Sequence, residues 1–336
     1  MPPFEVTMDK SFFPLHRLGL ALALSLGLAS CSQIELGRIY FANHGTEARL
    51  DSPLPARLPF REHKGWIVVQ ASINGSPPMD FVVDTGASML TLLTGPKTEA
   101  LKLDMSGLRR IAGEGVATVT AAVQPGLDID FGPVALLDQT VLAIPLDRVL
   151  CDKGIEAPPF SGVIGHELFS RYVVEIDHAR GEVVLHDPET YDYRGDGLVV
   201  PADISGRQPF VQAQLQGPDG ARYEARLHVD SGAGIDLSLF PQAHEAIKVP
   251  AGGKETTACF VGGLARYQSG TSVQLALAGA PAVETPASYS IGDEVIDTGQ
   301  HGRLGARFLS RYDVVYDYSR GRIILEPRSA PPAAAP

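Results

Sequence analysis

Apolar and polar residues alternate in short runs along most of the chain, a period-two pattern that is typical of β-strands. Residues 65–73 (GWIVVQASI) and 79–84 (MDFVVD) flank Asn74-Gly75, which is a strong signal for a two-residue hairpin turn. Residues 206–216 and 223–230 form a second pair of this kind around a Pro-Asp-Gly turn. The pattern therefore predicts paired strands joined by tight turns.

Helical periodicity is scarce. Long amphipathic helices are absent from the pattern, and the only short helical candidates follow Gly165 and Gly305. The expected fold class is therefore all-β (mostly β), built from small sheets with Gly and Pro turns.

Two short motifs read almost alike, FVVDTGASMLTL around Asp84 and LHVDSGAGIDLSLF around Asp230. Each places one carboxylate between an apolar run and small residues. The acids are followed by Thr85-Gly86 and by Ser231-Gly232. The hydroxyl groups can hold a loop by hydrogen bonds, and the glycines permit backbone geometries that other residues avoid. Two such motifs predict a pair of carboxylates brought together by a two-fold arrangement.

The repetition extends beyond the acids. The sequence GVIGHELFSRYVVEIDHARGEVVLHDP begins at Gly162, and GRLGARFLSRYDVVYDYSRGRIILEP begins at Gly302 in an ungapped register. The two acid motifs are separated by a slightly larger offset, so loop lengths differ while the order of elements is kept. This pattern indicates an internal duplication of one supersecondary design.

These motifs resemble those of aspartic proteases of the pepsin and retroviral-protease class, and most closely bacterial retropepsin-like proteins with two lobes in one chain. The matching residues are Asp84-Thr85-Gly86-Ala87 and Asp230-Ser231-Gly232-Ala233, followed by the apolar-apolar-Gly elements Val163-Ile164-Gly165 and Arg303-Leu304-Gly305. Arg303 departs from the family pattern.

The resemblance implies two homologous retropepsin-like lobes in a bilobal acid-protease fold. Lobe 1 is expected at residues 56–190 and lobe 2 at residues 191–327. A short Pro/Ala tail at 328–336 is expected to be disordered. Such a chain would act as a monomer with an intramolecular two-fold axis and would need no cofactor or metal.

The resemblance also assigns roles. Asp84 and Asp230 would be the catalytic pair, sharing one proton because two adjacent carboxylates do not both ionise cheaply. Thr85 and Ser231 would donate hydrogen bonds across the interface, and Gly86 and Gly232 would let backbone amides approach the acids. Bracing of the loops from behind is expected from Val163, Ile164, Gly165, Leu304 and Gly305. A polypeptide would be the substrate.

Gly-rich segments occur at matching points of the two predicted lobes. Gly113 and Gly115 lie in IAGEGVATV, and Gly262 and Gly263 lie in FVGGLARYQ. Loops of this kind can open and close over an extended peptide, so we expect two flaps, although plain β-turns are the alternative.

The first thirty residues differ from the rest. Lys10, His16 and Arg17 precede an apolar stretch from Leu18 to Ala29, which is too short to span a bilayer but suits a signal peptide. The stretch ends in a sequence that resembles a bacterial lipobox, with Cys31 as the lipidated residue. We therefore expect a lipoprotein signal peptide at 1–30 and a tether at 31–55.

Lipidation at Cys31 would anchor the protein to a membrane of the cell envelope. Ser32 at the next position favours the outer membrane and a periplasm-facing protein in a Gram-negative host. An ordinary signal peptide is the alternative, and Met8 is an alternative start. The remaining cysteines are Cys151 and Cys259, and whether they form a disulfide stays open.

The net charge and the motifs of the sequence argue against several other classes of protein. A net charge of −11 without a basic run argues against nucleic acid as a partner. His166-Glu167 lacks the second histidine of the zinc-protease motif, since Ser170 occupies that position. Asp128 and Asp130 lack the other ligands of a calcium loop, and no G-x-S-x-G motif is present. His228 is expected to be a strand residue rather than a third catalyst.

Three functions fit the sequence. The first is a membrane-tethered aspartic endopeptidase. The second is a non-catalytic peptide-binding lipoprotein, which Arg303 and Gly234 favour slightly. The third is a structural envelope protein whose two acids never meet.

Overall fold

The computed structural model describes residues 37–111, 119–146, 159–260, 263–292 and 299–328. The chain divides into two units, residues 1–44 and 45–336, and the described part of the first unit contains a helical turn at residues 37–40. All of the described strands belong to the second unit. No helix in the described ranges has both the length and the apolarity to cross a membrane.

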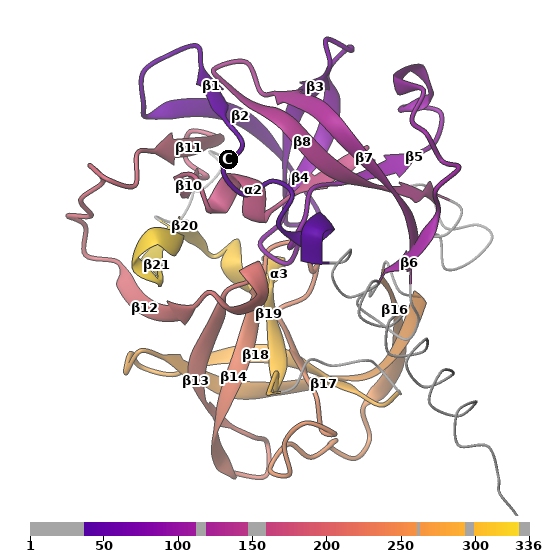
Figure 1. Cartoon of the computed structure of the whole chain (residues 1–336). Helices are drawn as coiled ribbons and strands as arrows, with labels where there is room; N and C mark the ends of the chain where they lie inside the picture. The colour runs from indigo at the N-terminus through magenta and orange to yellow at the C-terminus, as the bar shows by residue number, and fades with distance from the viewer. Residues whose placement is uncertain (1–36, 112–118, 147–158, 261–262, 293–298, 329–336) are drawn as a thin grey trace, which may run out of the picture. The chain divides into compact units, whose positions relative to one another are not determined.

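The second unit is mostly β, as predicted (Figure 1). The described part of the second unit begins with strand β1 (Ala48–Leu50). The described strands of its first half (residues 56–190) are β2 (Ala56–His63), β3 (Trp66–Ile73), β4 (Met79–Val83), β5 (Thr91–Thr94), β6 (Arg109–Ile111), β7 (Val119–Asp130), β8 (Val134–Pro145), β9 (Gly162–Ile164), β10 (Val173–Asp177) and β11 (Glu182–His186). The strands of its second half (residues 191–327) are β12 (Leu198–Asp203), β13 (Phe210–Gln216), β14 (Arg222–Asp230), β15 (Leu237–Leu239), β16 (Lys254–Phe260), β17 (Gly263–Leu277), β18 (Val283–Ser290), β19 (Gly302–Gly305), β20 (Tyr312–Asp317) and β21 (Arg322–Pro327).

The helices among the described residues of the second unit are single turns. Two of them are α-helices, α2 (His166–Phe169) and α3 (Ala306–Leu309), which follow Gly165 and Gly305 as predicted. The 3-10 helices in the described ranges are η1 (Glu99–Leu101), η3 (Ser205–Arg207) and η4 (Tyr318–Arg320).

Local sequence explains the strands and their turns. Burial alternates along β13 and along the start of β14, so one face of this hairpin packs on the core and the other meets solvent. The turn between β3 and β4 has Asn74 at φ 47° and Gly75 at φ 75°, and the N–H of Ser76 donates to the carbonyl of Ile73 at 2.9 Å. Two successive positive φ angles are what the Asn-Gly pair supplies most readily.

The two halves use the same strand pairings. Strand β4 runs parallel to β9 as β14 runs parallel to β19. Strand β5 is antiparallel to β9 and parallel to β8, and β15 repeats this arrangement with β19 and β18. The hairpins β3–β4, β6–β7, β7–β8 and β10–β11 likewise recur as β13–β14, β16–β17, β17–β18 and β20–β21.

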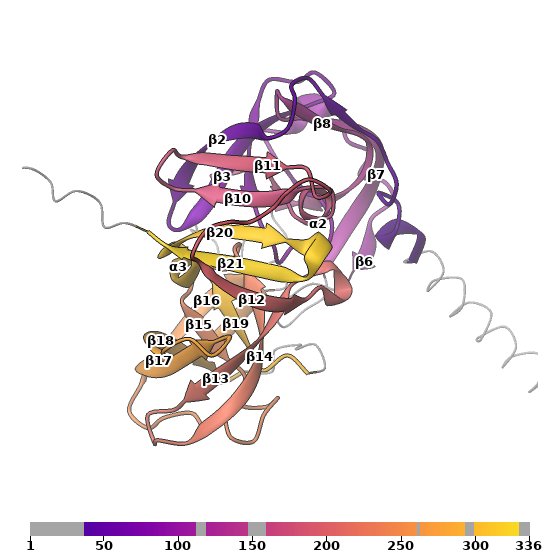
Figure 2. The same ribbon diagram turned by 90° about the vertical axis from the view of Figure 1, so that its left-hand side faces the viewer.

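One antiparallel sheet joins the halves. Its strand order is β2, β11, β10, β20, β21 and β12, which Figure 2 shows as a stack. The pairing between β10 and β20 lies at its centre, with Val174 opposite Tyr316 and Ile176 opposite Val314. Equivalent strands therefore meet at the middle of this sheet, as a two-fold relation between the halves requires.

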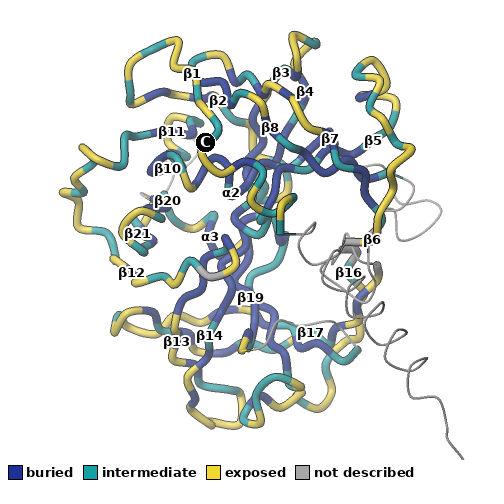
Figure 3. The backbone as a smooth tube through the Cα atoms, viewed as in Figure 1, coloured by how far each residue is buried: buried dark blue, intermediate teal, exposed yellow. Residues whose placement is uncertain are grey.

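Burial is concentrated where the strands of the two halves converge. Ile164, Leu304 and Phe308 are almost completely buried, and Figure 3 shows long buried stretches along β14 and β19. The last residues of β14, which lead to Asp230, lose their alternation and are buried on both sides. An acid placed here sits at the end of a rigid strand.

The predicted tether at residues 31–55 is wrong at its C-terminal end. Strand β1 lies inside that range and pairs antiparallel with β8, with Ala48 opposite Leu136 and Leu50 opposite Val134. Three residues of strand are too short to give a periodic signal, so tertiary pairing rather than local pattern determines this element. The predicted signal peptide at 1–30 lies outside the described residues.

Candidate active site

Each acid motif follows a strand that is held on both sides. Asp84 comes directly after β4, and its N–H donates to the carbonyl of Ile164 at 2.9 Å. Asp230 is the last residue of β14 and is in register with Gly305 of β19. The parallel pairing of β4 with β9 and of β14 with β19 thus fixes the start of each loop.

Thr85 and Ser231 connect the two loops by a reciprocal set of hydrogen bonds. The Thr85 hydroxyl donates to the carbonyl of Val229 at 2.7 Å, and the Ser231 hydroxyl donates to the carbonyl of Val83 at 3.0 Å. Each hydroxyl oxygen also accepts the backbone N–H of the other residue at 3.0 Å. The predicted donation across the interface is confirmed, and all four bonds are buried.

The two carboxylates meet around Gly86 and Gly232. A Cβ atom added to Gly86 would lie 2.7 Å from Oδ1 of Asp230 and 3.0 Å from Oδ1 of Asp84. The two Oδ1 atoms therefore cannot be farther apart than the sum of these two distances. A Cβ atom added to Gly232 would overlap the carboxylate of Asp84. Glycine is required at both positions because the opposite acid occupies the space of a side chain.

Backbone N–H groups orient the acids. Oδ1 of Asp84 accepts the N–H of Gly86 at 2.7 Å. Oδ1 of Asp230 accepts the N–H groups of Gly232 and Ala233 at 2.9 and 3.0 Å. These bonds fix the direction of each side chain.

Trp66 and Gln208 form a second reciprocal contact that the sequence did not indicate. The indole Nε1–H of Trp66 donates to the carbonyl of Gly232 at 2.7 Å, and the Gln208 amide donates to the carbonyl of Gly86. The strand registers make these two positions equivalent. Val82 and His228, two residues before the acids, pair with Val68 and Phe210, and Trp66 and Gln208 lie two residues before those partners. Each half therefore supports the acid loop of the other.

The apolar-apolar-Gly elements lie against the loops as expected for braces. Ile164 and Leu304 are buried, and Val163 is half-buried. A Cβ atom on Gly165 would overlap the carbonyl oxygen of Ala87, and one on Gly305 would overlap that of Ile235. Glycine lets β9 and β19 approach the loop backbones at this distance.

Arg303 occupies the β19 position that is equivalent to Val163 and lies beside an acid. Its Nε atom is 3.1 Å from Oδ2 of Asp230, and the two side chains are 7% and 6% exposed. The contact is an ion pair within the site. The sequence identified Arg303 only as a departure from the family pattern.

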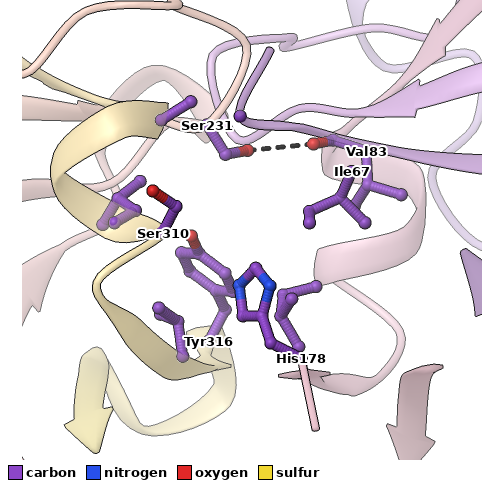
Figure 4. A pocket seen from close by; sticks show the side chains of 11 residues that line it. Ile67, Val83, His178, Ser231, Ser310 and Tyr316 are labelled. Atoms are coloured by element: carbon purple, nitrogen blue, oxygen red, sulfur yellow. Dashed lines mark hydrogen bonds between the residues drawn. The ribbon is translucent and has the colours of Figure 1, made fainter. Parts of the chain in front are cut away.

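Two tyrosines lie near the acids, and one of them, Tyr316, lines a small cavity together with Val83 and Ser231. Burial raises the pKa of Tyr316 and of Tyr318, and the charges of Asp84 and Asp230 raise these pKa values further, so both phenols stay neutral. The cavity has a volume of about 20 Å³, enough for about one water molecule. Figure 4 shows Tyr316 and His178 across it from the hydrogen bond between Ser231 and Val83.

Other predicted residues are only partly covered by the structure. Gly113, Gly115 and Gly262 lie outside the described residues, while Gly263 is the first residue of β17. The hairpins that carry them, β6–β7 and β16–β17, are both present. Cys31 and Cys151 lie outside the described residues, so lipidation and the pairing of Cys151 with Cys259 stay open.

The described part of the chain has no group of three or more His, Cys, Asp or Glu side chains arranged to hold a metal ion. The described residues place two carboxyl groups, their N–H donors and the guanidinium of Arg303 at this site.

Comparison with known proteins agrees with the fold. A family model described as "Aspartyl protease" matches residues 69–168. No curated protein sequence matches the chain. Among solved structures, the aspartic proteinase from Irpex lacteus is similar with a TM-score of 0.51 and 13% identity, over 84% of this chain and 99% of that one. The chain therefore has the mostly-β fold of aspartic proteases.

His228 is a buried strand residue of the site region, as expected. It lies opposite Phe210 in the β13–β14 hairpin, and the two rings stack with centroids 5.1 Å apart. Burial lowers the pKa of His228 from 6.5 to about 4, and the nearby Arg303 and Arg226 lower it as well, while Asp230 opposes them. The imidazole is therefore neutral in the folded protein at neutral pH.

We predict that His228 makes the fold sensitive to acid. Between about pH 6.5 and 4, His228 is protonated in the unfolded chain but stays neutral in the folded protein. The free energy of unfolding therefore decreases by up to roughly 3 kcal/mol as the pH falls through this range. His228→Phe should remove this share of the decrease, which urea unfolding at pH 7 and pH 4 measures. His63→Phe on β2 is the control. An unchanged decrease in His228→Phe would exclude this assignment.

Proposed function

We propose that the chain is an aspartic-type endopeptidase in which Asp84 and Asp230 activate one water molecule. The observation that carries the proposal is the convergence of the two carboxylates around Gly86 and Gly232, fixed by the hydrogen bonds of Thr85 and Ser231. The fold of aspartic proteases supports it. The repeated strand pairings support two lobes that arose by internal duplication.

The chemistry needs one ionised and one protonated carboxyl. The ionised group takes a proton from water while the water oxygen bonds to the carbonyl carbon of the peptide, and the protonated group donates its proton to the carbonyl oxygen. The tetrahedral product then loses its C–N bond as a proton reaches the leaving nitrogen. No covalent bond forms between the protein and the peptide.

The hairpins β6–β7 and β16–β17 are suitable flaps because they occur at equivalent places in the two halves. We propose that the segments around Gly113 and Gly115 and around Gly262 and Gly263 close over an extended polypeptide. A peptide bound in this way would place one of its bonds near both acids.

A peptide-binding protein without catalysis is the second candidate. The ion pair between Arg303 and Asp230 favours it, because a cation at the site changes the charge balance that two carboxyl groups alone would have. The third candidate, a structural protein whose acids never meet, disagrees with the position of both carboxylates beside Gly86.

We predict that the soluble chain beginning at Ser32 cleaves extended or unfolded polypeptides and that either acid is indispensable. Asp84→Asn and Asp230→Asn should each reduce cleavage by at least about a thousandfold, and the double variant should be no worse, because neither carboxyl works without the other. Activity should decrease at high pH, when the pair loses its remaining proton. The assay is cleavage of a mixed peptide library from about pH 3 to 8.

Asp192→Asn is the matched control, since Asp192 is exposed and forms a surface ion pair with Arg194 at 2.9 Å. Peptide binding is measured in parallel. A wild type that binds peptides without cutting them, or Asn variants that cut as well as the wild type, would leave the peptide-binding protein as the function.

We further propose that a lipid on Cys31 tethers the enzyme to a membrane of the cell envelope, facing the periplasm and most simply at the outer membrane. In a Gram-negative host, Cys31→Ala should abolish acyl labelling and release or mislocalise the protein. Cys151→Ala, which changes a cysteine outside the signal sequence, should keep the label. Undiminished labelling of Cys31→Ala would exclude this anchor.

A further inference from the structure

Three pairs of equivalent positions beside the acids differ in the same way. Each pair has an apolar side chain in the first half and a polar one in the second half: Trp66 and Gln208, Phe160 and Gln300, Val163 and Arg303. The residues that follow Phe160 and Gln300 confirm the second pair, since each donates its N–H to the carbonyl of the residue four positions before its own acid, at 2.8 and 2.9 Å. The two sides of the site therefore differ in chemistry although their backbones are related.

Trp66 and Phe160, which we call the aromatic wall, lie next to the loop of the second acid. Their ring centroids are 5.5 Å apart in an edge-to-face arrangement, and both residues are half-exposed. The indole Nε1–H donates to the carbonyl of Gly232, and a Cβ atom on Gly234 would lie 3.9 Å from the same ring. One edge of the wall is thus held two residues after Asp230.

Val163 extends this apolar surface toward the first acid. In the parallel pairing of β9 with β4 it is opposite Val82, which is two residues before Asp84. Val82 is opposite Val68 in the β3–β4 hairpin, and Trp66 precedes Val68 by two positions, so these side chains share one face of the sheet. Val68 and Val82 are buried, whereas Trp66 and Val163 are half-exposed at the two ends of this row.

The equivalent face of the second half is polar. Gln208 is half-exposed and donates through its amide to the carbonyl of Gly86. Gln300 is buried, and its amide donates to the carbonyl of Gly302 at 3.4 Å. Arg303 is buried as well. A ligand on this side would therefore meet the amide of Gln208 where it meets aromatic rings on the other side.

We propose that the aromatic wall determines substrate specificity: the protein requires a large apolar residue on one side of the scissile bond and accepts polar residues on the other. This inference rests on the proposed peptidase function. A peptide bond held between the two acids has its flanking residues at equivalent places in the two halves, and successive side chains of an extended chain point in opposite directions. Burying an apolar side chain against Trp66 and Phe160 is favourable, whereas an amide surface gives no such gain.

The test measures kcat/KM for peptides that carry Phe, Leu or Gln at each position flanking the scissile bond. The wild type should prefer Phe and Leu at one of the two positions by about tenfold or more. Trp66→Gln installs the residue of the equivalent position and retains an amide donor for the carbonyl of Gly232, as Gln208 supplies one to Gly86. We expect this variant to lose the apolar preference.

Two further variants separate the apolar surface from the hydrogen bond. Trp66→Phe keeps an aromatic ring but has no N–H donor, so it should retain the preference even where the overall rate decreases. Phe160→Gln leaves the bond between Trp66 and Gly232 in place and should weaken the same preference, which keeps the test available if Trp66→Gln fails to fold. A merely structural role would lower kcat/KM for all peptides alike and leave the preference unchanged.

Trp66 is the single tryptophan of the chain, so its fluorescence reports on the wall without cleavage. In Asp84→Asn, which should bind peptides without cutting them, a peptide with Phe at the preferred position should change the indole emission. The same peptide with Gln at that position should bind about tenfold more weakly. Phe160→Gln in the Asp84→Asn background should reduce this difference.

The outcomes separate the two claims. A wild type that never cleaves overturns the proposed peptidase, and the fluorescence titration of the same peptides then still decides whether the wall binds an apolar side chain. A wild type that cleaves with equal apolar preference at both flanking positions overturns the one-sided specificity. An unchanged preference in Trp66→Gln and Phe160→Gln overturns the role of the wall.

Discussion

Thr85 and Ser231 each donate a hydroxyl proton across the junction between the halves, and each accepts an N–H from the other. The candidate site depends on this exchange. It brings two loops so close that only glycine fits between one acid and the other, at Gly86 and at Gly232. Because the bonds are buried and fully reciprocal, neither loop can move without breaking bonds to the opposite half. The two carboxyl groups are thereby held close together on either side of Gly86.

The pair of acids and its hydrogen bonds could be predicted from the sequence because the residues that form them are consecutive in each motif. An acid, a hydroxyl residue and a glycine in a row occur twice, and the doubled order predicted both the mostly-β fold and the hydrogen bonds of Thr85 and Ser231. The contacts of Trp66 and Gln208 could not be predicted in this way. They become equivalent only after the strands are aligned, because the two hairpins before the acids differ in length. Strand β1 was not predicted because its pairing with β8 determines it, rather than an alternation of apolar and polar residues in its own sequence.

Arg303 shows the limit of motif comparison most clearly. The sequence identifies an arginine where an apolar residue is typical, but alternation along a strand gives only the face on which a side chain lies. The structure adds that its guanidinium reaches Asp230. Arg303 and His228 are opposite each other in β19 and β14. The neutral buried imidazole of His228 favours folding at higher pH.

The central claim is that the paired acids stabilise a tetrahedral transition state rather than only a bound peptide. The most direct measurement compares the affinity of extended peptides with that of the same peptides carrying a secondary alcohol in place of the scissile carbonyl. A hydrolase should bind the alcohol series at least about a hundredfold more tightly, because a tetrahedral carbon bearing a hydroxyl imitates the attacked carbonyl. Asp84→Asn should abolish that preference. Equal affinity for the two series in the wild type would contradict the account.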